Sequence, residues 1–346
     1  MKYFSNLLLF FIIISNTIHS CNKKENESIK SNKYCENIDS LSYSNSNKIV
    51  NGCEFNENIL NIFPESKSVV SIVSGSGLCS GTFIAENIIL TAAHCFDINK
   101  LSENKKTIDN EIKNITIYSD LSHEIYPLNK NELNTSSISS ITIHPFFQKY
   151  CSNKNNISNG FHKCNFADLA LLKTTKKASE IGAKVSKLTT NDSKDETIII
   201  VGYGKNNDIE IPTKRIKKWA FSRIYEFNFI QFSLSNITVD NNSYISLGEF
   251  YKTIMSPFIT PSYLDDPRKA FLFIEDDNYG ICQGDSGGPL FVKKGNEFLA
   301  VGVVHANIGK APQICEYKKS ININIGAYRE WLINETKLLG ENITFY

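Results

Sequence analysis

A glycine-rich run around a single serine constrains this chain more than any other feature. Residues Gly284 to Leu290 read Gly-Asp-Ser-Gly-Gly-Pro-Leu, so Ser286 follows an acidic residue and precedes two glycines. Glycine adopts backbone conformations that other residues avoid, and its missing side chain lets another molecule approach closely. An ordinary glycine turn would not need Asp and Ser at its centre. The run therefore predicts a tight turn that presents the Ser286 hydroxyl to an approaching molecule.

Two upstream stretches supply the residue types that such a serine needs. Leu90 to Cys95 contains His94, and Asp168 begins the run Asp-Leu-Ala-Leu-Leu. A serine hydroxyl is a poor nucleophile unless a neighbouring base takes its proton, and imidazole titrates in a suitable range. A carboxylate on the far ring nitrogen fixes the tautomer, and backbone N–H groups at the serine turn bind the oxyanion. The pattern predicts Ser286 as nucleophile, His94 as base and Asp168 as the residue that orients the base.

Five motifs in sequence order resemble the chymotrypsin/trypsin-like serine protease family between Ile49 and about Leu339. They are Ile49 to Gly52, Thr91 to Cys95, Asp168 to Leu172, Val201 to Gly204 and Gly284 to Leu290. The order His, Asp, Ser also matches that family and differs from the subtilisin and α/β-hydrolase orders.

The resemblance implies an all-β fold of two six-stranded antiparallel β-barrels with the site between them and a C-terminal helix. It implies a serine endopeptidase that forms an acyl-enzyme, with the oxyanion bound by the backbone N–H groups of Gly284 and Ser286. Its substrate would be a protein or peptide, and no cofactor or metal would be needed.

The hydrophobic pattern agrees with an all-β chain. Short β-branched and aromatic runs predict strands, namely Val69–Val73, Thr82–Leu90, Ile198–Tyr203 and Phe298–Val304. Only the region from about Ala327 to Leu339 is predicted as a helix, with one apolar face formed by Tyr328, Trp331, Leu332, Leu338 and Leu339. Asn99–Ser140 and Lys205–Asp277 have the composition of inserted loops, although Trp219–Leu234 also fits a strand.

The N-terminus predicts export. Lys2 precedes an apolar run from Leu7 to Ile14 that is too short to span a bilayer and fits a secretory signal, assigned to residues 1–20. Nine cysteines in an exported chain predict disulfides. The segment before Cys21 resembles a bacterial lipobox, so one alternative is a lipid on Cys21 that holds the protein at a bacterial membrane. The other is free secretion after cleavage near Ser20.

The polar segment 21–48 is predicted to be a tether or pro-segment, and residues 49–346 the protease domain. The resemblance implies that Ile49 becomes a new N-terminus when an activating protease cuts after Lys48. The Ile49 ammonium would then pair with Asp285, beside the nucleophile, and order the site. The alternative is that Ile49 merely begins a strand.

The resemblance also implies two disulfides. Cys79 with Cys95 would lie beside the catalytic histidine, and Cys282 with Cys315 would brace the specificity pocket. For the other cysteines connectivity stays open, and the pairs considered are Cys151 with Cys164 and Cys35 with Cys53.

The specificity pocket differs from that of trypsin. Gly280 stands six residues before Ser286, where a trypsin has Asp, and Ile281 follows it, so the resemblance implies a neutral pocket. Asn307 is predicted to narrow this pocket and Ser320 to line its rear. His305 stands where the family has serine, so it is a candidate to approach Asp168, the alternative being a residue of the pocket wall.

Charge argues against some other functions. The 37 basic and 36 acidic residues leave a net charge of +1, which gives no reason to expect nucleic acid as a partner. No metal-ligand spacing, phosphate loop or dinucleotide motif is present. A protease homologue that acts as a binding module is the alternative to an enzyme, and an esterase with the same triad has no distinguishing feature. Turnover of peptides would separate these readings.

Overall fold

The computed structural model describes most of the chain from residue 52 to the C-terminus. The described residues are 52–75, 77–96, 110–124, 134–151, 166–190, 196–205, 214–225, 237–239, 243–245, 257–263, 267–275, 280–307, 315 and 319–346. The predicted signal at 1–20, the tether at 21–48, Cys21 and the cut after Lys48 lie outside these residues.

Six strands form a first closed antiparallel barrel in the order β2-β3-β4-β8-β7-β5. Their bounds are β2 Val69–Ser74, β3 Gly77–Ala85, β4 Ile88–Thr91, β5 Thr116–Tyr118, β7 Thr135–Ile143 and β8 Ala170–Thr174. The barrel closes where β2 pairs with β5, with Ile72 opposite Ile117. Strand β4 is buried along its whole length, which explains its uninterrupted apolar sequence.

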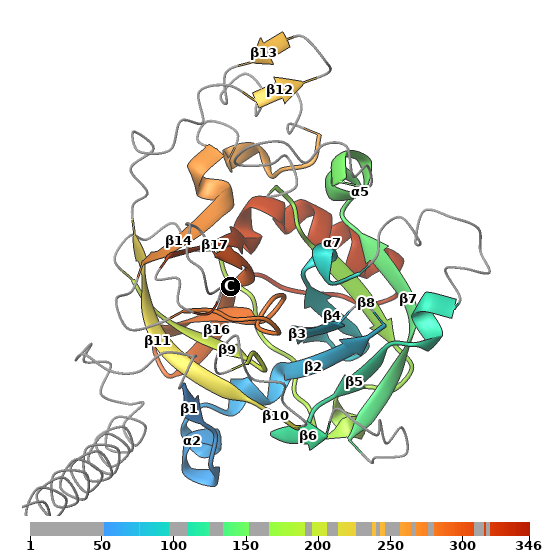
Figure 1. Cartoon of the computed structure of the whole chain (residues 1–346), viewed down its shortest axis with the longest axis vertical. Coiled ribbons are helices and arrows are strands. Elements are labelled where there is room, and N and C mark those ends of the chain that lie inside the picture. The colour runs from blue at the N-terminus through green and yellow to red at the C-terminus, as the bar shows by residue number, and fades with distance from the viewer. Residues whose placement is uncertain are drawn as a thin grey trace, which may run out of the picture. The chain divides into compact units, whose positions relative to one another are not determined.

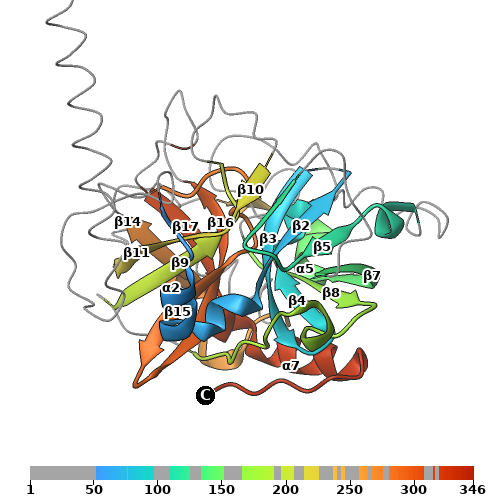
Figure 2. The same cartoon turned by 90° about the horizontal axis from the view of Figure 1, so that it is seen from below.

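Six further strands form the second barrel. Its strands are β9 Thr197–Gly202, β11 Lys218–Tyr225, β14 Phe271–Glu275, β15 Pro289–Lys294, β16 Glu297–Asn307 and β17 Lys319–Asn324. They run in the order β11-β14-β17-β16-β15-β9, and pairing of β9 with β11 closes the ring. Strand β1 (Cys53–Glu54) is added beside β11. Figures 1 and 2 show the two barrels side by side. The predicted fold is therefore confirmed.

The C-terminal helix is present, but its apolar face differs from the prediction. Residues Ile325–Tyr328 form the 3-10 turn η12, and α7 runs over Arg329–Leu338. Tyr328 and Leu332 are buried as predicted, whereas Leu338 is 79% exposed. The prediction for Leu338 is wrong because the helix turns this position away from the barrel.

Several other boundaries differ from the predictions. The run Thr82–Leu90 spans two strands, because a turn at Glu86 and Asn87 separates β3 from β4. Short helices that were not predicted include α2 (Glu57–Ile62) and α5 (Pro145–Cys151).

The two segments predicted as loops contain strands. Asn99–Ser140 includes β5, β6 (Ser122–Glu124) and most of β7, while Lys205–Asp277 includes β10 (Lys214–Ile216), β11, β12 (Ile237–Val239), β13 (Ser243–Ile245) and β14. Strand β7 has the sequence Thr-Ser-Ser-Ile-Ser-Ser-Ile-Thr-Ile. It was not predicted as a strand because its serines resemble the composition of a loop. Its place in the barrel comes from pairing with β5 and β8.

The apolar core of the second barrel includes the end of the glycine-rich run that contains Ser286. Leu290 and Val301 belong to one buried cluster, and neither is measurably exposed. Leu290 is the last residue of the glycine-rich run, four residues after Ser286, so packing in this barrel fixes the end of that run. No helix among the described residues is long and apolar enough to cross a membrane.

We expect Leu290→Ala to lower the free energy of unfolding by about 2–5 kcal/mol, because it leaves a cavity in a closely packed core. The matched variant Leu338→Ala removes the same atoms from an exposed helix position and should change stability by less than about 0.5 kcal/mol. Chemical denaturation of both variants measures the difference. Equal losses would contradict the placement of these two leucines.

Candidate active site

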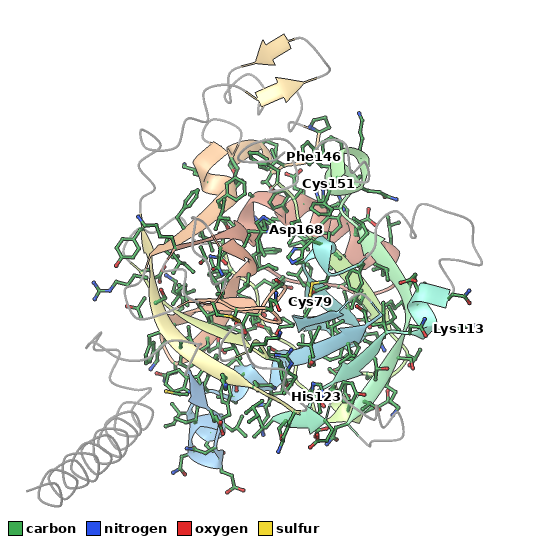
Figure 3. The ribbon with its side chains drawn as sticks, in the orientation of Figure 1. Cys79, Lys113, His123, Phe146, Cys151 and Asp168 are labelled. Carbon is green, nitrogen blue, oxygen red and sulfur yellow. A yellow bond between two sulfur atoms is a disulfide. The ribbon has the colours of Figure 1, made fainter. Side chains whose placement is uncertain are left out.

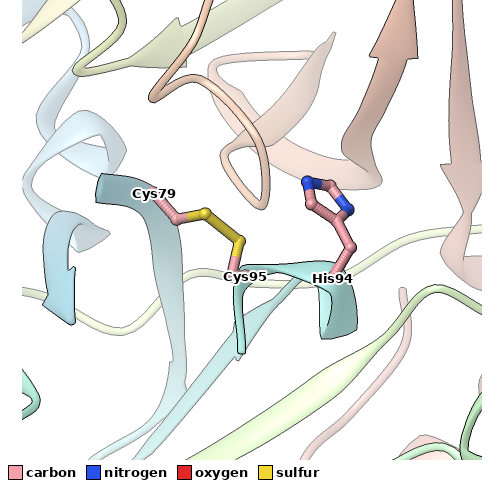
Figure 4. A group of neighbouring side chains, drawn as sticks. All are labelled: Cys79, His94 and Cys95. Atoms are coloured by element: carbon pink, nitrogen blue, oxygen red, sulfur yellow. A yellow bond between two sulfur atoms is a disulfide. The ribbon is translucent and has the colours of Figure 1, made fainter. Parts of the chain in front are cut away.

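His94 lies in a short turn that a disulfide holds against the first barrel. The 3-10 turn η2 (Ala93–Cys95) follows β4, and Cys95 is bonded to Cys79 on β3. Figure 4 shows this bond beside the His94 ring, which points away from it. The His94 side chain is 37% exposed. The ring is therefore fixed at its base and open to an incoming molecule.

The carboxylate of Asp168 holds this histidine at two points. Asp168 Oδ2 lies 2.5 Å from His94 Nδ1, and Oδ1 accepts a hydrogen bond of 2.8 Å from the His94 backbone N–H. The Asp168 side chain is completely buried. A buried carboxylate bonded to Nδ1 selects the tautomer whose Nε2 carries a free lone pair, as a general base requires.

A strained turn at Ala167 sets the position of the Asp168 carboxylate. Ala167 has φ of 54°, a left-handed conformation that residues with a side chain seldom adopt. The Leu169 N–H bonds to the Ala167 carbonyl at 2.7 Å, which closes a tight turn around Asp168. The Tyr328 hydroxyl accepts the Ala167 N–H at 3.0 Å. Strain of this kind persists only where surrounding contacts impose it, and it occurs often at functional sites.

The two charges shift each other's pKa in opposite directions. Burial acts to raise the pKa of Asp168, but the neighbouring His94 and His305 outweigh it and hold the pKa well below its ordinary value. Loss of water around the ring acts to lower the pKa of His94, yet the charge and hydrogen bond of Asp168 give a net increase. Asp168 therefore stays ionised and stabilises the imidazolium form of His94.

The serine turn from the second barrel packs against the histidine turn. The Ser286 carbonyl accepts a hydrogen bond of 2.8 Å from the Ser80 N–H and lies 3.9 Å from Cys95 Sγ. Gly287, at φ of 82°, leaves no room for a side chain, since a Cβ there would lie 2.9 Å from the Ala92 N. In the described part of the chain, Ser286 Oγ and His94 Nε2 are not hydrogen-bonded to each other. Such contacts often tighten only when substrate binds.

The same turn presents two backbone donors. Gly284 has φ of 103°, and within the described residues neither its N–H nor that of Ser286 is bonded to a protein acceptor. Unpaired donors beside a serine hydroxyl are the arrangement that stabilises an oxyanion. A side chain at 284 would place its Cβ 2.9 Å from Leu78 Cδ2, so the turn requires glycine for space as well as for conformation.

Ser80 connects this turn to both barrels, and no sequence motif predicted this role. Its Oγ donates to the Gly284 carbonyl at 2.8 Å and accepts the Tyr203 N–H at 3.0 Å. The Thr91 hydroxyl donates to the Ser80 carbonyl at 2.8 Å. Ser80 follows Cys79 directly, but a single serine within a strand carries no recognisable pattern.

Asp285 is buried and lies next to Ser286 in the sequence. Its Oδ1 accepts the Gly204 N–H at 2.7 Å and its Oδ2 accepts the Cys282 N–H at 2.9 Å. Burial raises the pKa of the Asp285 carboxyl to about 6, although these two hydrogen bonds oppose the increase. Its proposed partner Ile49 lies outside the described residues, as does Lys48.

The residues predicted for the specificity pocket lie together. Gly280 and Ile281 are buried, and Asn307 donates from Nδ2 to the Ile281 carbonyl at 2.9 Å. Ser320 lies opposite Asn307 across β16 and β17. Cys282 is bonded to Cys315 behind this region. Cys53 and Cys151 also form disulfides, whereas Cys35 and Cys164 lie outside the described residues.

Two groups of described residues have ligand-type atoms within 4.8 Å of one another. In one, His94 lies with Cys79 and Cys95, whose sulfurs are already bonded together. In the other, Asp168 lies between His94 and His305, and hydrogen bonds account for both contacts. Neither arrangement needs a metal ion to explain it.

The chain has two antiparallel barrels, with a histidine–aspartate pair on one and a serine in a glycine-rich turn on the other. This combination defines the chymotrypsin class of fold and site. The Trypsin family model matches residues 63–226 and 246–332, so the chain belongs to the trypsin family of serine proteases. It is similar to Serine protease 28 of Mus musculus, with 27% identity over 237 residues, or 67% of this chain and 69% of the mouse protein. Family membership makes the chain a protease homologue of the hydrolase class, with proteins or peptides as substrates.

The buried Asp285 carboxyl should make the uncleaved chain less stable as the pH rises from about 4 to about 6. Its folded pKa of about 6 exceeds the ordinary 3.8, so the folded state binds more protons over this range. At about 1.4 kcal/mol per unit, the loss approaches 3 kcal/mol. Denaturation across this range should show the loss in the parent and not in Asp285→Asn. The exposed control Glu330→Gln should retain the parent slope, and an unchanged slope in Asp285→Asn would contradict the assignment.

Proposed function

We propose that the protein is a secreted serine endopeptidase that uses Ser286, His94 and Asp168. The observation that carries the proposal is the pair of hydrogen bonds from His94 to the buried Asp168, set beside the turn that presents Ser286. The pair leaves His94 Nε2 as the basic atom on the exposed side of the ring. Disulfides among the described cysteines agree with an oxidising compartment.

In the proposed reaction His94 Nε2 takes the proton of Ser286 Oγ while Oγ attacks the peptide carbonyl carbon. The N–H groups of Gly284 and Ser286 bind the resulting oxyanion, and each such donor contributes about 10²–10³-fold to kcat. Collapse expels the amine, which receives the proton from His94, and leaves an acyl-enzyme. Water, deprotonated by His94, then releases the acid and restores Ser286.

The pocket favours an uncharged side chain on the substrate. Gly280 brings no charge, and the Asn307 amide is directed to the Ile281 carbonyl. A Lys or Arg side chain would therefore lose water without meeting a carboxylate at position 280, where a trypsin has Asp. We infer that cleavage follows apolar or uncharged residues.

The alternative is a protease homologue that acts as a binding module. It is favoured by His305 and Ala306, which replace the wall residues usual in the family, and by the lack of a hydrogen bond between Ser286 Oγ and His94 among the described residues. Free secretion and a lipid on Cys21 both remain compatible with export.

A fluorophosphonate probe should label Ser286 and abolish turnover of a peptide library, whereas Ser286→Ala should show neither labelling nor turnover. Reaction requires a serine activated by its neighbouring base. Mass spectrometry of the labelled peptide identifies the site. Ser139→Ala, an exposed serine on β7, is the matched control and should behave as the parent. Absence of labelling in the parent after cleavage at Lys48 would favour the binding module.

We further propose that the chain is a zymogen cut after Lys48. The Asp285 carboxylate is buried and bonded to two backbone N–H groups, so an ammonium at Ile49 would gain a buried partner. Lys48→Gln should give an intact chain whose activity is lower by at least about a hundredfold, from an ion pair worth roughly 3–5 kcal/mol. Gel electrophoresis and peptide turnover measure both effects. Full activity of uncleaved Lys48→Gln would contradict the proposal.

A further inference from the structure

A second histidine reaches the carboxylate that orients His94. His305 Nδ1 lies 2.5 Å from Asp168 Oδ2, the same oxygen that lies 2.5 Å from His94 Nδ1. The two imidazole centres are 5.7 Å apart, with an angle of 63° between the ring planes. His305 is only 8% exposed. The carboxylate thus lies between one buried ring and one ring that opens to substrate.

A bulge in β16 brings His305 to this position. Val304 lies opposite Asn322 on β17 and Ala306 lies opposite Ile321, so His305 falls where the pairing register shifts. An extra residue of this kind bends a strand and changes the direction of a side chain. The contact with Asp168 is therefore built into the strand pairing, and it does not depend on a free rotamer at a surface.

The hydrogen bonds fix the protons of both rings. Asp168 Oδ2 accepts from two Nδ1 atoms, so each Nδ1 carries a hydrogen and, in each neutral ring, Nε2 carries none. The single negative charge of the carboxylate is then divided between two imidazoles. An imidazolium at His94 receives less of that charge than it would if Asp168 served His94 alone.

Among the described residues, the ionisable side chains of Tyr328 and Asp285 belong to segments close to this cluster. The Tyr328 hydroxyl, on η12, accepts the Ala167 N–H, and burial raises its pKa well above the usual range, so it stays neutral. Asp285, in the serine turn, directs both oxygens at backbone N–H groups of Gly204 and Cys282.

We propose that His305 is a positioning residue that shares Asp168 with His94 and extends to lower pH the range in which His94 acts as a base. The inference rests on the proposed function of Ser286, His94 and Asp168 and deepens it. A neutral His305 withdraws charge from Asp168 by its hydrogen bond, and a protonated one repels a proton on His94. Both effects disfavour the imidazolium of His94, so they act in the same direction.

The test compares His305→Ala and His305→Ser with the parent, all cleaved at Lys48. The rate of Ser286 labelling by a fluorophosphonate is measured against pH. Removing one hydrogen bond to a charged group should move the acid limb of the Ala variant upward by about one pH unit. The Ser variant, which keeps a shorter donor, should move less. An acid limb that stays in place in His305→Ala overturns the proposal.

A control variant excludes a general effect of losing a buried histidine. His123 on β6 is 4% exposed and lies far from Asp168 in Figure 3. His123→Ser should leave the acid limb where it is in the parent. Thermal unfolding of each variant checks that the fold is retained.

NMR of chains with ¹⁵N-labelled histidine gives a readout that does not need activity. In Ser286→Ala, two strongly deshielded Nδ1 protons should appear, one for each bond to Asp168, and only one should remain when His305→Ser is added. Two such protons support the contact even if Ser286 is never labelled at any pH, an outcome that would contradict the protease function alone. One proton in the Ser286→Ala parent overturns the role of His305.

Discussion

The buried negative charge of Asp168 is the constraint on which the rest of the site depends. A carboxylate without contact to water is costly unless several donors surround it. Here the donors are the backbone and ring of His94 in the first barrel and the ring of His305 in the second. The full set of donors is present only when the two barrels lie together, so formation of the barrel interface completes the surroundings of Asp168. The strained backbone at Ala167 is tolerated for the same reason.

A second set of contacts holds the turn that contains Ser286 at this interface. Ser80, on the first barrel, bonds to the turn on both sides of Asp285, at the carbonyls of Gly284 and Ser286. Asp285 is itself held by backbone groups of the second barrel, and burial raises its pKa. A new ammonium that pairs with Asp285 would change the charge state of a residue fixed at the centre of this set. In the proposed activation, this pairing would affect the backbone N–H groups of Gly284 and Ser286 directly, because these residues flank Asp285.

The family resemblance carried by short motifs predicted the two barrels and the C-terminal helix, and both are present. The same motifs named Ser286, His94 and Asp168, whose catalytic roles stay a prediction. The sequence did not predict β7, whose serines are placed in a barrel by pairing with neighbours far along the chain. Nor did the sequence predict Ser80, because its contacts are with residues far along the chain. The Ser80 hydroxyl bonds to Gly284, which lies 204 positions away. Leu338 was misplaced because helical periodicity shows that a face is apolar but not where that face ends.

The roles proposed for His305 and Asn307 would place the support of the base and the substrate pocket on one strand, β16. The bulge that turns His305 toward Asp168 lies two residues before Asn307, whose amide bonds to the carbonyl of Ile281 at the pocket. A change in the path of β16 would move both side chains together, one beside Asp168 and one beside Ile281. Under the proposed function, a substrate that contacts Asn307 would therefore also alter the support of His94. Specificity would then appear in kcat as well as in KM, because the pocket wall and the support of the base would belong to one strand.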